Sequence, residues 1–216
     1  MKKTYLILEF TVVFIFLVLP PLTAVSSPAY MDALASFHFP SVIKLFIALI
    51  LFFQFRFLSG KRCEINNYRK IFYFMLSTGL LFLSLSASSA LKFFLGETEN
   101  LSPFKQTPLV IPGGLFIVFN FFCAAFYEEV LYRLFLPETL IMLIQENKAA
   151  RVLFECSVIV LFAFSHKAAG ISGVVHTFIS ASVLRFCTVK TGGILIPSAA
   201  HFLHNLSVLL FSAALS

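Results

Sequence analysis

The 216-residue sequence contains few charged residues. Asp, Glu, Lys and Arg make up 12% of the chain, whereas they make up about a quarter of soluble globular proteins. Hydrophobic residues make up 59%, and the mean hydropathy is +0.94. This composition excludes an ordinary soluble domain and predicts an integral membrane protein. We find neither an internal repeat nor a segment with the composition of a soluble domain.

Other signatures are missing as well. The four cysteines form no CxxC pair, and three of them fall in apolar runs, which argues against a disulfide framework and against a cysteine metal site. No HExxH zinc motif occurs. The net charge is +6, but the basic residues stand between apolar runs and form no patch with stacking aromatics. The positive-inside rule therefore explains them better than nucleic-acid binding does.

Apolar segments predict an all-α, polytopic transmembrane bundle of about seven spans. They cover residues 5–19, 42–58, 71–95, 109–136, 152–166, 170–186 and 194–215. The first follows Lys2 and Lys3 and is closed by Pro20-Pro21, with small residues at 23–27, which is also the layout of a secretory signal. We expect an uncleaved span because the rest of the chain is polytopic. Cleavage would leave six spans.

Basic residues gather in two short connections, after the second segment and at residues 145–151. The positive-inside rule places both connections in the cytoplasm together with the N-terminus. We therefore expect a multi-pass protein of the cell membrane with a cytoplasmic N-terminus. The helical pattern of the fourth segment is expected to run past Pro137 to the charged turn at 145–151.

Three charges, Glu128, Glu129 and Arg133, lie inside the fourth apolar segment. An ionised group at bilayer depth costs from about 3 to more than 10 kcal/mol, so such residues usually face a protein interior. Glu129 and Arg133 are four residues apart and are expected to form an ion pair. A structural ion-pair cluster would account for that pair but leaves Glu128 without a partner, and a lone buried carboxylate suits a general base.

Later segments carry further polar groups. At 1.5 Å per residue, Glu128 and His166 lie about 26 and 22 Å from the turn that joins their helices, and thus at similar depth. His201 and Asn205 share one face of the last segment, at shallower positions about 12 and 18 Å along it. Imidazole and carboxamide groups directed at one cavity can donate hydrogen bonds to an oxyanion.

Two other histidines have less definite roles. His204 flanks the face of His201 or turns toward a neighbouring helix, and the spacing leaves both arrangements open. His176 has no partner at helical spacing. We therefore expect a structural role for His176.

Three motifs occur in order on separate apolar segments: Glu128-Glu129-xxx-Arg133, Phe162-xxx-His166 and His201-xxx-Asn205. They resemble the EExxxR, FxxxH and HxxxN motifs of the CPBP family, the CAAX protease and bacteriocin-processing family also called Abi. The resemblance covers about residues 109–210. It implies N-terminal transmembrane segments over 1–108 and a catalytic transmembrane core over 109–216, within one membrane domain. Leu134 departs from the family, which often has Gly after the motif Arg.

The resemblance implies an intramembrane endopeptidase acting on a membrane-associated, possibly lipidated, peptide or protein. In that pattern Glu128 and His166 activate water, His201 and Asn205 stabilise the oxyanion, and Glu129 and Arg133 support them. Members are often described as metalloproteases, and Glu128, His166 and His201 would then bind a divalent metal such as zinc. We favour a metal-free mechanism, because HExxH is absent and Asn is an uncommon zinc ligand.

Two functions of other classes are alternatives. One is a non-proteolytic immunity or scaffolding protein of the membrane, which would have no need of a lone buried carboxylate. The other is a transporter that uses the buried charges, and the absence of repeated halves with broken helices counts against it.

Overall fold

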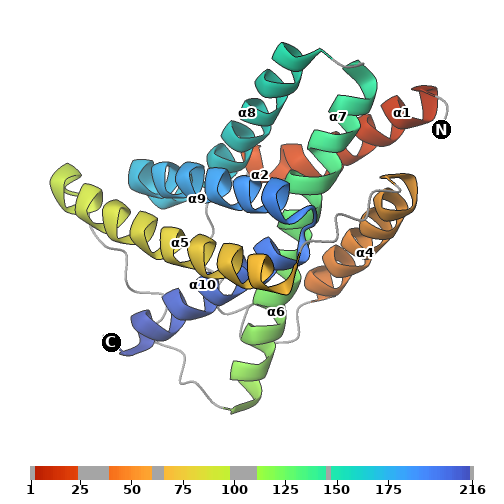
Figure 1. Ribbon diagram of the computed structural model, residues 1–216. Coiled ribbons are helices and arrows are strands. Elements are labelled where there is room, and N and C mark those ends of the chain that lie inside the picture. Colours follow the sequence, from red (N-terminus) through yellow and green to blue (C-terminus); the bar gives the residue numbers. More distant parts are fainter. Residues whose placement is uncertain (1–2, 24–38, 60–65, 98–110, 145–146, 215–216) are drawn as a thin grey trace.

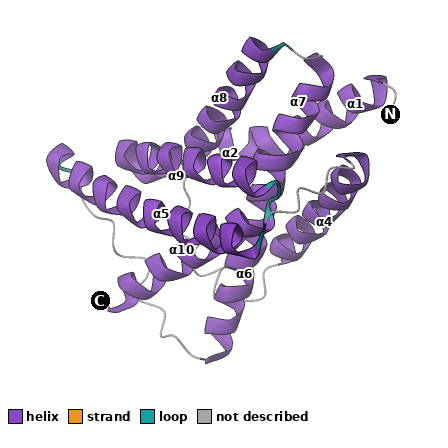
Figure 2. Cartoon of the chain, viewed as in Figure 1, coloured by secondary structure: helices purple, strands orange, loops and turns teal. Residues whose placement is uncertain are grey.

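The computed structural model describes residues 3–23, 39–59, 66–97, 111–144 and 147–214, and all regular structure in these ranges is helical (Figure 2). The predicted all-α class is confirmed. By length and composition, four helical stretches can cross a membrane: Lys3–Thr23, Asn67–Leu95, Gly114–Leu143 and Lys167–Thr191. Two shorter apolar helices are Phe39–Phe55 and Leu195–Leu210.

The helices form a bundle whose members cross at a range of angles (Figure 1). In chain order they are α1 (Lys3–Val13), η1 (Phe14–Val18), α2 (Leu19–Thr23), α4 (Phe39–Ser59), α5 (Asn67–Leu95), α6 (Ile111–Glu129), η3 (Val130–Phe135), α7 (Leu136–Ile144), α8 (Lys148–Ser165), η4 (Lys167–Ala169), α9 (Gly170–Thr191) and α10 (Leu195–Ala214). Helices α5 and α9 lie side by side, and α10 packs against both α5 and α6. The fifth predicted span corresponds to α8, which has three charged residues in its N-terminal half. Helix α8 is neither among the four stretches that can cross a membrane nor one of the two shorter apolar helices.

Several helix ends differ from the predicted ones because of capping side chains. Asn66 accepts a hydrogen bond from the Tyr68 amide, so α5 begins at Asn67, four residues before the expected start. Asn147 caps α8 in the same way through the Ala149 and Ala150 amides. The charged turn predicted at 145–151 is therefore shorter, because α8 already begins at Lys148.

The prolines predicted to close the first segment do not end its helix. Helical structure continues through Pro20 and Pro21 to Thr23, after the π-helical segment η1. The candidate cleavage residues beyond Thr23 lie outside the described residues.

The fourth segment runs past Pro137 to Ile144, as predicted, through the π-helical segment η3 and then α7. Pro137 has no amide hydrogen, so the carbonyl of Arg133 four residues earlier loses its usual helical partner. Arg185 of α9 replaces that partner, with its Nη1 donating to the Arg133 carbonyl at 2.9 Å. The helix thus survives the proline with the help of a neighbouring helix.

Helix α9 is held at its start by a residue from the end of α5. The Ile171 amide and the Ser172 hydroxyl both donate hydrogen bonds to the Glu97 carboxylate. The hydrogen bond from the Ser172 hydroxyl is the main reason that the pKa of Glu97 lies below its usual value of 4.5, because it favours the ionised carboxylate. Gly170 fits beside this carboxylate with a positive φ of 79°, and a Cβ there would come within 3.0 Å of Glu97 Oε2.

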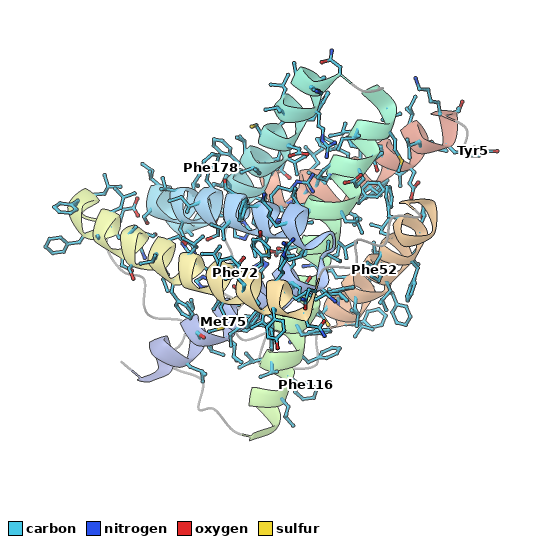
Figure 3. All side chains as sticks on the ribbon, viewed as in Figure 1. Tyr5, Phe52, Phe72, Met75, Phe116 and Phe178 are labelled. Atoms are coloured by element: carbon cyan, nitrogen blue, oxygen red, sulfur yellow. The ribbon has the colours of Figure 1, made fainter. Side chains whose placement is uncertain are left out.

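The core is formed largely by aromatic and aliphatic side chains around η3. Phe52 and Phe55 of α4 make edge contacts with Phe126 and Phe135, at ring-centroid distances of 6.0 and 5.4 Å. Large apolar side chains also cover the outside of the bundle, as Figure 3 shows for Tyr5 and Met75. Such an outer face fits a lipid surrounding.

Candidate active site

Glu129 and Arg133 form the ion pair predicted from their spacing. The Arg133 Nε atom lies 3.5 Å from Glu129 Oε2, and both side chains are buried. The guanidinium carbon of Arg133 also lies 4.0 Å from the centre of the Phe162 ring, a cation–π contact. The two charges are thus held between η3 and α8.

His201 of α10 lies between the two glutamates. Its Nδ1 is 2.9 Å from Glu129 Oε1, and its Nε2 is 3.8 Å from Glu128 Oε2. The Glu129 carboxylate pairs with the Arg133 guanidinium and serves as the acceptor, so His201 Nδ1 carries the donated hydrogen. His201 Nε2 is left facing Glu128, beyond hydrogen-bond distance.

The shallower position expected for His201 is wrong. That expectation treated distance along each helix as depth, which holds only for helices that run parallel. Helix α10 crosses α6 at an angle (Figure 1), so residues at different distances along the two helices meet. The bond between Glu129 and His201 could not be read from the sequence, since it joins residues 72 positions apart.

The two glutamates differ in exposure. The Glu128 side chain is 26% exposed, whereas Glu129 is fully buried. Tyr132, one turn after Glu128, is buried with its ring 4.8 Å from the Phe162 ring centre, and no sequence motif indicated it. Of the two carboxylates, Glu128 is therefore the one that a water molecule or a substrate can reach.

His166 stands at the C-terminal end of α8. Its Nδ1 lies 3.1 Å from both the Phe162 carbonyl and the Ser165 hydroxyl, and that hydroxyl donates to the same carbonyl. Nδ1 therefore carries a hydrogen, and in the neutral ring Nε2 has the lone pair. Within the described residues, no hydrogen bond or ion pair joins His166 to Glu128, so the structure does not bring this predicted pair into direct contact.

Asn205 follows His201 by one turn on the same face of α10, as predicted, and is half-buried. In the described part of the chain it makes no hydrogen bond. Its direction is consequently set by the orientation of α10 as a whole.

The predicted metal ligands do not converge. Among the described residues, no three His, Cys, Asp or Glu side chains are grouped so that they could hold a metal ion. The set of Glu128, His166 and His201 therefore does not fit a bound zinc in this arrangement, since such a site needs three protein ligands each about 2 Å from the metal.

A small cavity lies on the other side of Arg133, between η3, α8 and α9. Its lining includes Arg133, Glu155 and Arg185, and Arg185 Nη2 donates to Glu155 Oε1 at 2.8 Å. The volume of about 10 Å³ matches roughly one water molecule. This cavity is too small to receive a peptide.

Fold and site together define an integral membrane protein with a cluster of carboxylate and imidazole groups inside a helical bundle. The family model for type II CAAX prenyl endopeptidases, Rce1-like, matches residues 111–207, and all three motifs fall within this range. The match confirms the resemblance drawn from the motifs, and it shows that residues 111–207 are similar to this family. No curated protein and no solved structure matches the chain.

Proposed function

We propose that the protein is an intramembrane endopeptidase that hydrolyses peptide bonds in membrane-associated peptides or proteins, as CAAX prenyl endopeptidases do. The Rce1-like match supports a protease of this type. The observation that carries the proposal is the position of His201, bonded to the buried Glu129 and facing the accessible Glu128. The basic connections and the N-terminus would face the cytoplasm.

In the proposed first step, Glu128 takes a proton from a water molecule and the water oxygen attacks the carbonyl carbon of the scissile bond. Glu128 suits this role because it is the accessible carboxylate of the two and forms no ion pair with an arginine of the described ranges. His166 Nε2 would orient the same water by accepting its second hydrogen, since Nδ1 is occupied by the Phe162 carbonyl.

In the second step, the negative oxygen of the tetrahedral intermediate would accept hydrogen bonds from His201 Nε2 and the Asn205 amide. Donation from Nε2 requires a proton there in addition to the one on Nδ1. With both protons present, the positive charges of His201 and Arg133 balance the negative charges of Glu129 and the oxyanion, since Glu128 holds the proton taken from water. The intermediate then collapses as the C–N bond breaks, and Glu128 gives its proton to the leaving amine.

We propose that this reaction needs no metal, because the predicted ligands do not converge and Glu128 with His201 supplies both a base and an oxyanion donor. The substrate would be a peptide or protein segment that reaches the bundle from the membrane, with or without a lipid group. The Rce1-like match supports a prenylated CAAX sequence as the first substrate to test.

The test compares Glu128→Gln with wild type in proteoliposomes, using one fluorogenic CAAX peptide with its prenyl group and the same peptide without it. Loss of a general base should lower the cleavage rate by about 10²- to 10⁴-fold. Glu9→Gln is the matched control, since Glu9 of α1 contacts Gln54 and lies outside the site. Cleavage of the prenylated peptide by Glu128→Gln at the wild-type rate would sink the assignment.

A further inference from the structure

A second group of polar side chains, three of them buried and His176 half-buried, lies where α5, α9 and α10 meet. It comprises Ser84, His176, Ser180 and His204, none of which belongs to the three motifs. The Nε2 atoms of His176 and His204 are 3.3 Å apart, and the His176 Nδ1 atom is 3.1 Å from the Ser84 hydroxyl. His176, which has no partner at helical spacing in the sequence, thus connects α5 to α10.

The hydrogen bonds of this group have one direction. Ser84 donates its single hydrogen to the Leu81 carbonyl at 2.8 Å, so toward His176 it can only accept. His176 Nδ1 must then carry the hydrogen, which leaves a lone pair on Nε2. His204 Nε2 is therefore the donor to His176.

His204 depends on this one bond. Its side chain is 4% exposed, and its Nδ1 has no hydrogen-bond partner in the described part of the protein. The His204 ring also contacts the Phe82 ring of α5, at a centroid distance of 5.6 Å. Polar groups inside a membrane bundle are costly unless bonded, so the bond to His176 strongly selects one orientation of the His204 ring.

The pair adjoins the candidate active site. His204 directly precedes Asn205 and follows His201 by three residues. Helix α10 is consequently fixed at two points, by His201 to Glu129 and by His204 to His176. Because these contacts reach two different helices, α6 and α9, they fix the rotation of α10 about its own axis, and that rotation decides where Asn205 points.

We propose that Ser84, His176 and His204 form a positioning network that sets the rotation of α10 and so directs the Asn205 amide toward the oxyanion. The inference rests on the proposed peptidase function. His204 is a positioning residue here, because it acts through Asn205 and touches no reacting atom.

The test measures kcat and KM of peptide cleavage for wild type, Glu128→Gln, His204→Leu and His204→Gln. Loss of an oxyanion donor costs about 10²- to 10³-fold in kcat, and His204→Leu should lose a large part of that factor with KM unchanged. His204→Gln keeps an N–H donor at a similar distance and should restore kcat. Should His204→Leu fail to fold, Ser84→Ala weakens the same network from α5 and should lower kcat in the same direction.

A background variant separates positioning from general stability. In Asn205→Ala, adding His204→Leu should cause no further loss of kcat, because the donor that the network orients is already gone. An additive loss, or a fall in Tm with unchanged kcat, would overturn the proposal. So would stoichiometric zinc in the wild type that His204→Leu lacks, since two nitrogens 3.3 Å apart could instead share a metal ion.

The two proposals fail in different ways. An active wild type, an inactive Glu128→Gln and a fully active His204→Leu would overturn the positioning role alone. A wild type that cleaves no faster than Glu128→Gln would overturn the peptidase function and the positioning role together.

Discussion

The most informative perturbation is Glu129→Gln, which keeps the size of a fully buried side chain and removes its charge. The change affects two contacts at once. It replaces the carboxylate that accepts from His201 Nδ1 at 2.9 Å, and it removes the charge opposite Arg133 at 3.5 Å. The first contact concerns the orientation of His201, and the second concerns the stability of the bundle.

The two effects differ in size. A hydrogen bond to a charged group contributes about 1.5–3 kcal/mol. The glutamine amide oxygen can still accept from His201 Nδ1, so the bond weakens by about 1–1.5 kcal/mol from the charged to the neutral case. If this bond acts mainly in the transition state, kcat falls by about 5- to 13-fold at 1.36 kcal/mol per tenfold. Removing one partner of a buried ion pair costs about 3–5 kcal/mol of folding free energy, because Arg133 then stays buried without its counter-charge.

A second variant separates these effects. Glu129→Gln with Arg133→Met removes both charges, and an apolar replacement of a buried ion pair is often neutral or stabilising. We expect the double variant to recover most of the lost stability, measured by thermal unfolding in micelles, while kcat stays low. A Glu129→Gln enzyme with wild-type kcat, or a double variant that recovers both quantities, would refute the role assigned to Glu129.

Two other predictions concern pH and metal. The pKa of Glu97 is lowered from 4.5 in the folded protein, so its contribution to stability is present above about pH 4.5 and is lost as the pH falls through the folded pKa. Between about pH 6 and pH 3.5, the Tm of wild type should therefore fall more than that of Glu97→Gln, and equal falls would contradict this. Treatment with a zinc chelator should leave peptide cleavage unchanged, because the predicted ligands do not converge; a loss of activity that added zinc reverses would show a metal-dependent reaction.

Features governed by local spacing could be predicted from the sequence. The helical class follows from long apolar runs, and the ion pair of Glu129 with Arg133 follows from positions four residues apart on one helix. The shared face of His201 and Asn205 follows from the same spacing. These features depend only on residues near one another in the chain.

Features that depend on a neighbouring helix could not be predicted. Pro137 removes a hydrogen bond from its own helix, and the sequence does not show that Arg185 supplies a replacement from α9. The partners of His176 and His204 are equally invisible, since Ser84 lies 92 positions before His176. Depth along a helix also failed as a guide to contact, because the helices cross at angles that helix length does not set.

Contacts with neighbouring helices stabilise the helical turn that carries Glu129 and Arg133. Two residues of the helical hairpin α9–α10 bond the helical turn that carries Glu129 and Arg133. Arg185 of α9 donates to the Arg133 carbonyl, and His201 of α10 donates to the Glu129 carboxylate. The chain turns between α9 and α10 within the three residues 192–194, and the φ of 65° at Gly192 favours glycine. This short connection leaves α9 and α10 little freedom to move independently.

That hairpin lies almost wholly within the Rce1-like residues, but its orientation depends on more than those residues. Glu97 bonds the start of α9, and Ser84 bonds His176 near the middle of the same helix. Both come from α5 or directly after it, in the part of the chain before the match begins at residue 111. The N-terminal half therefore does more than add spans, because it holds the hairpin that in turn holds the two glutamates.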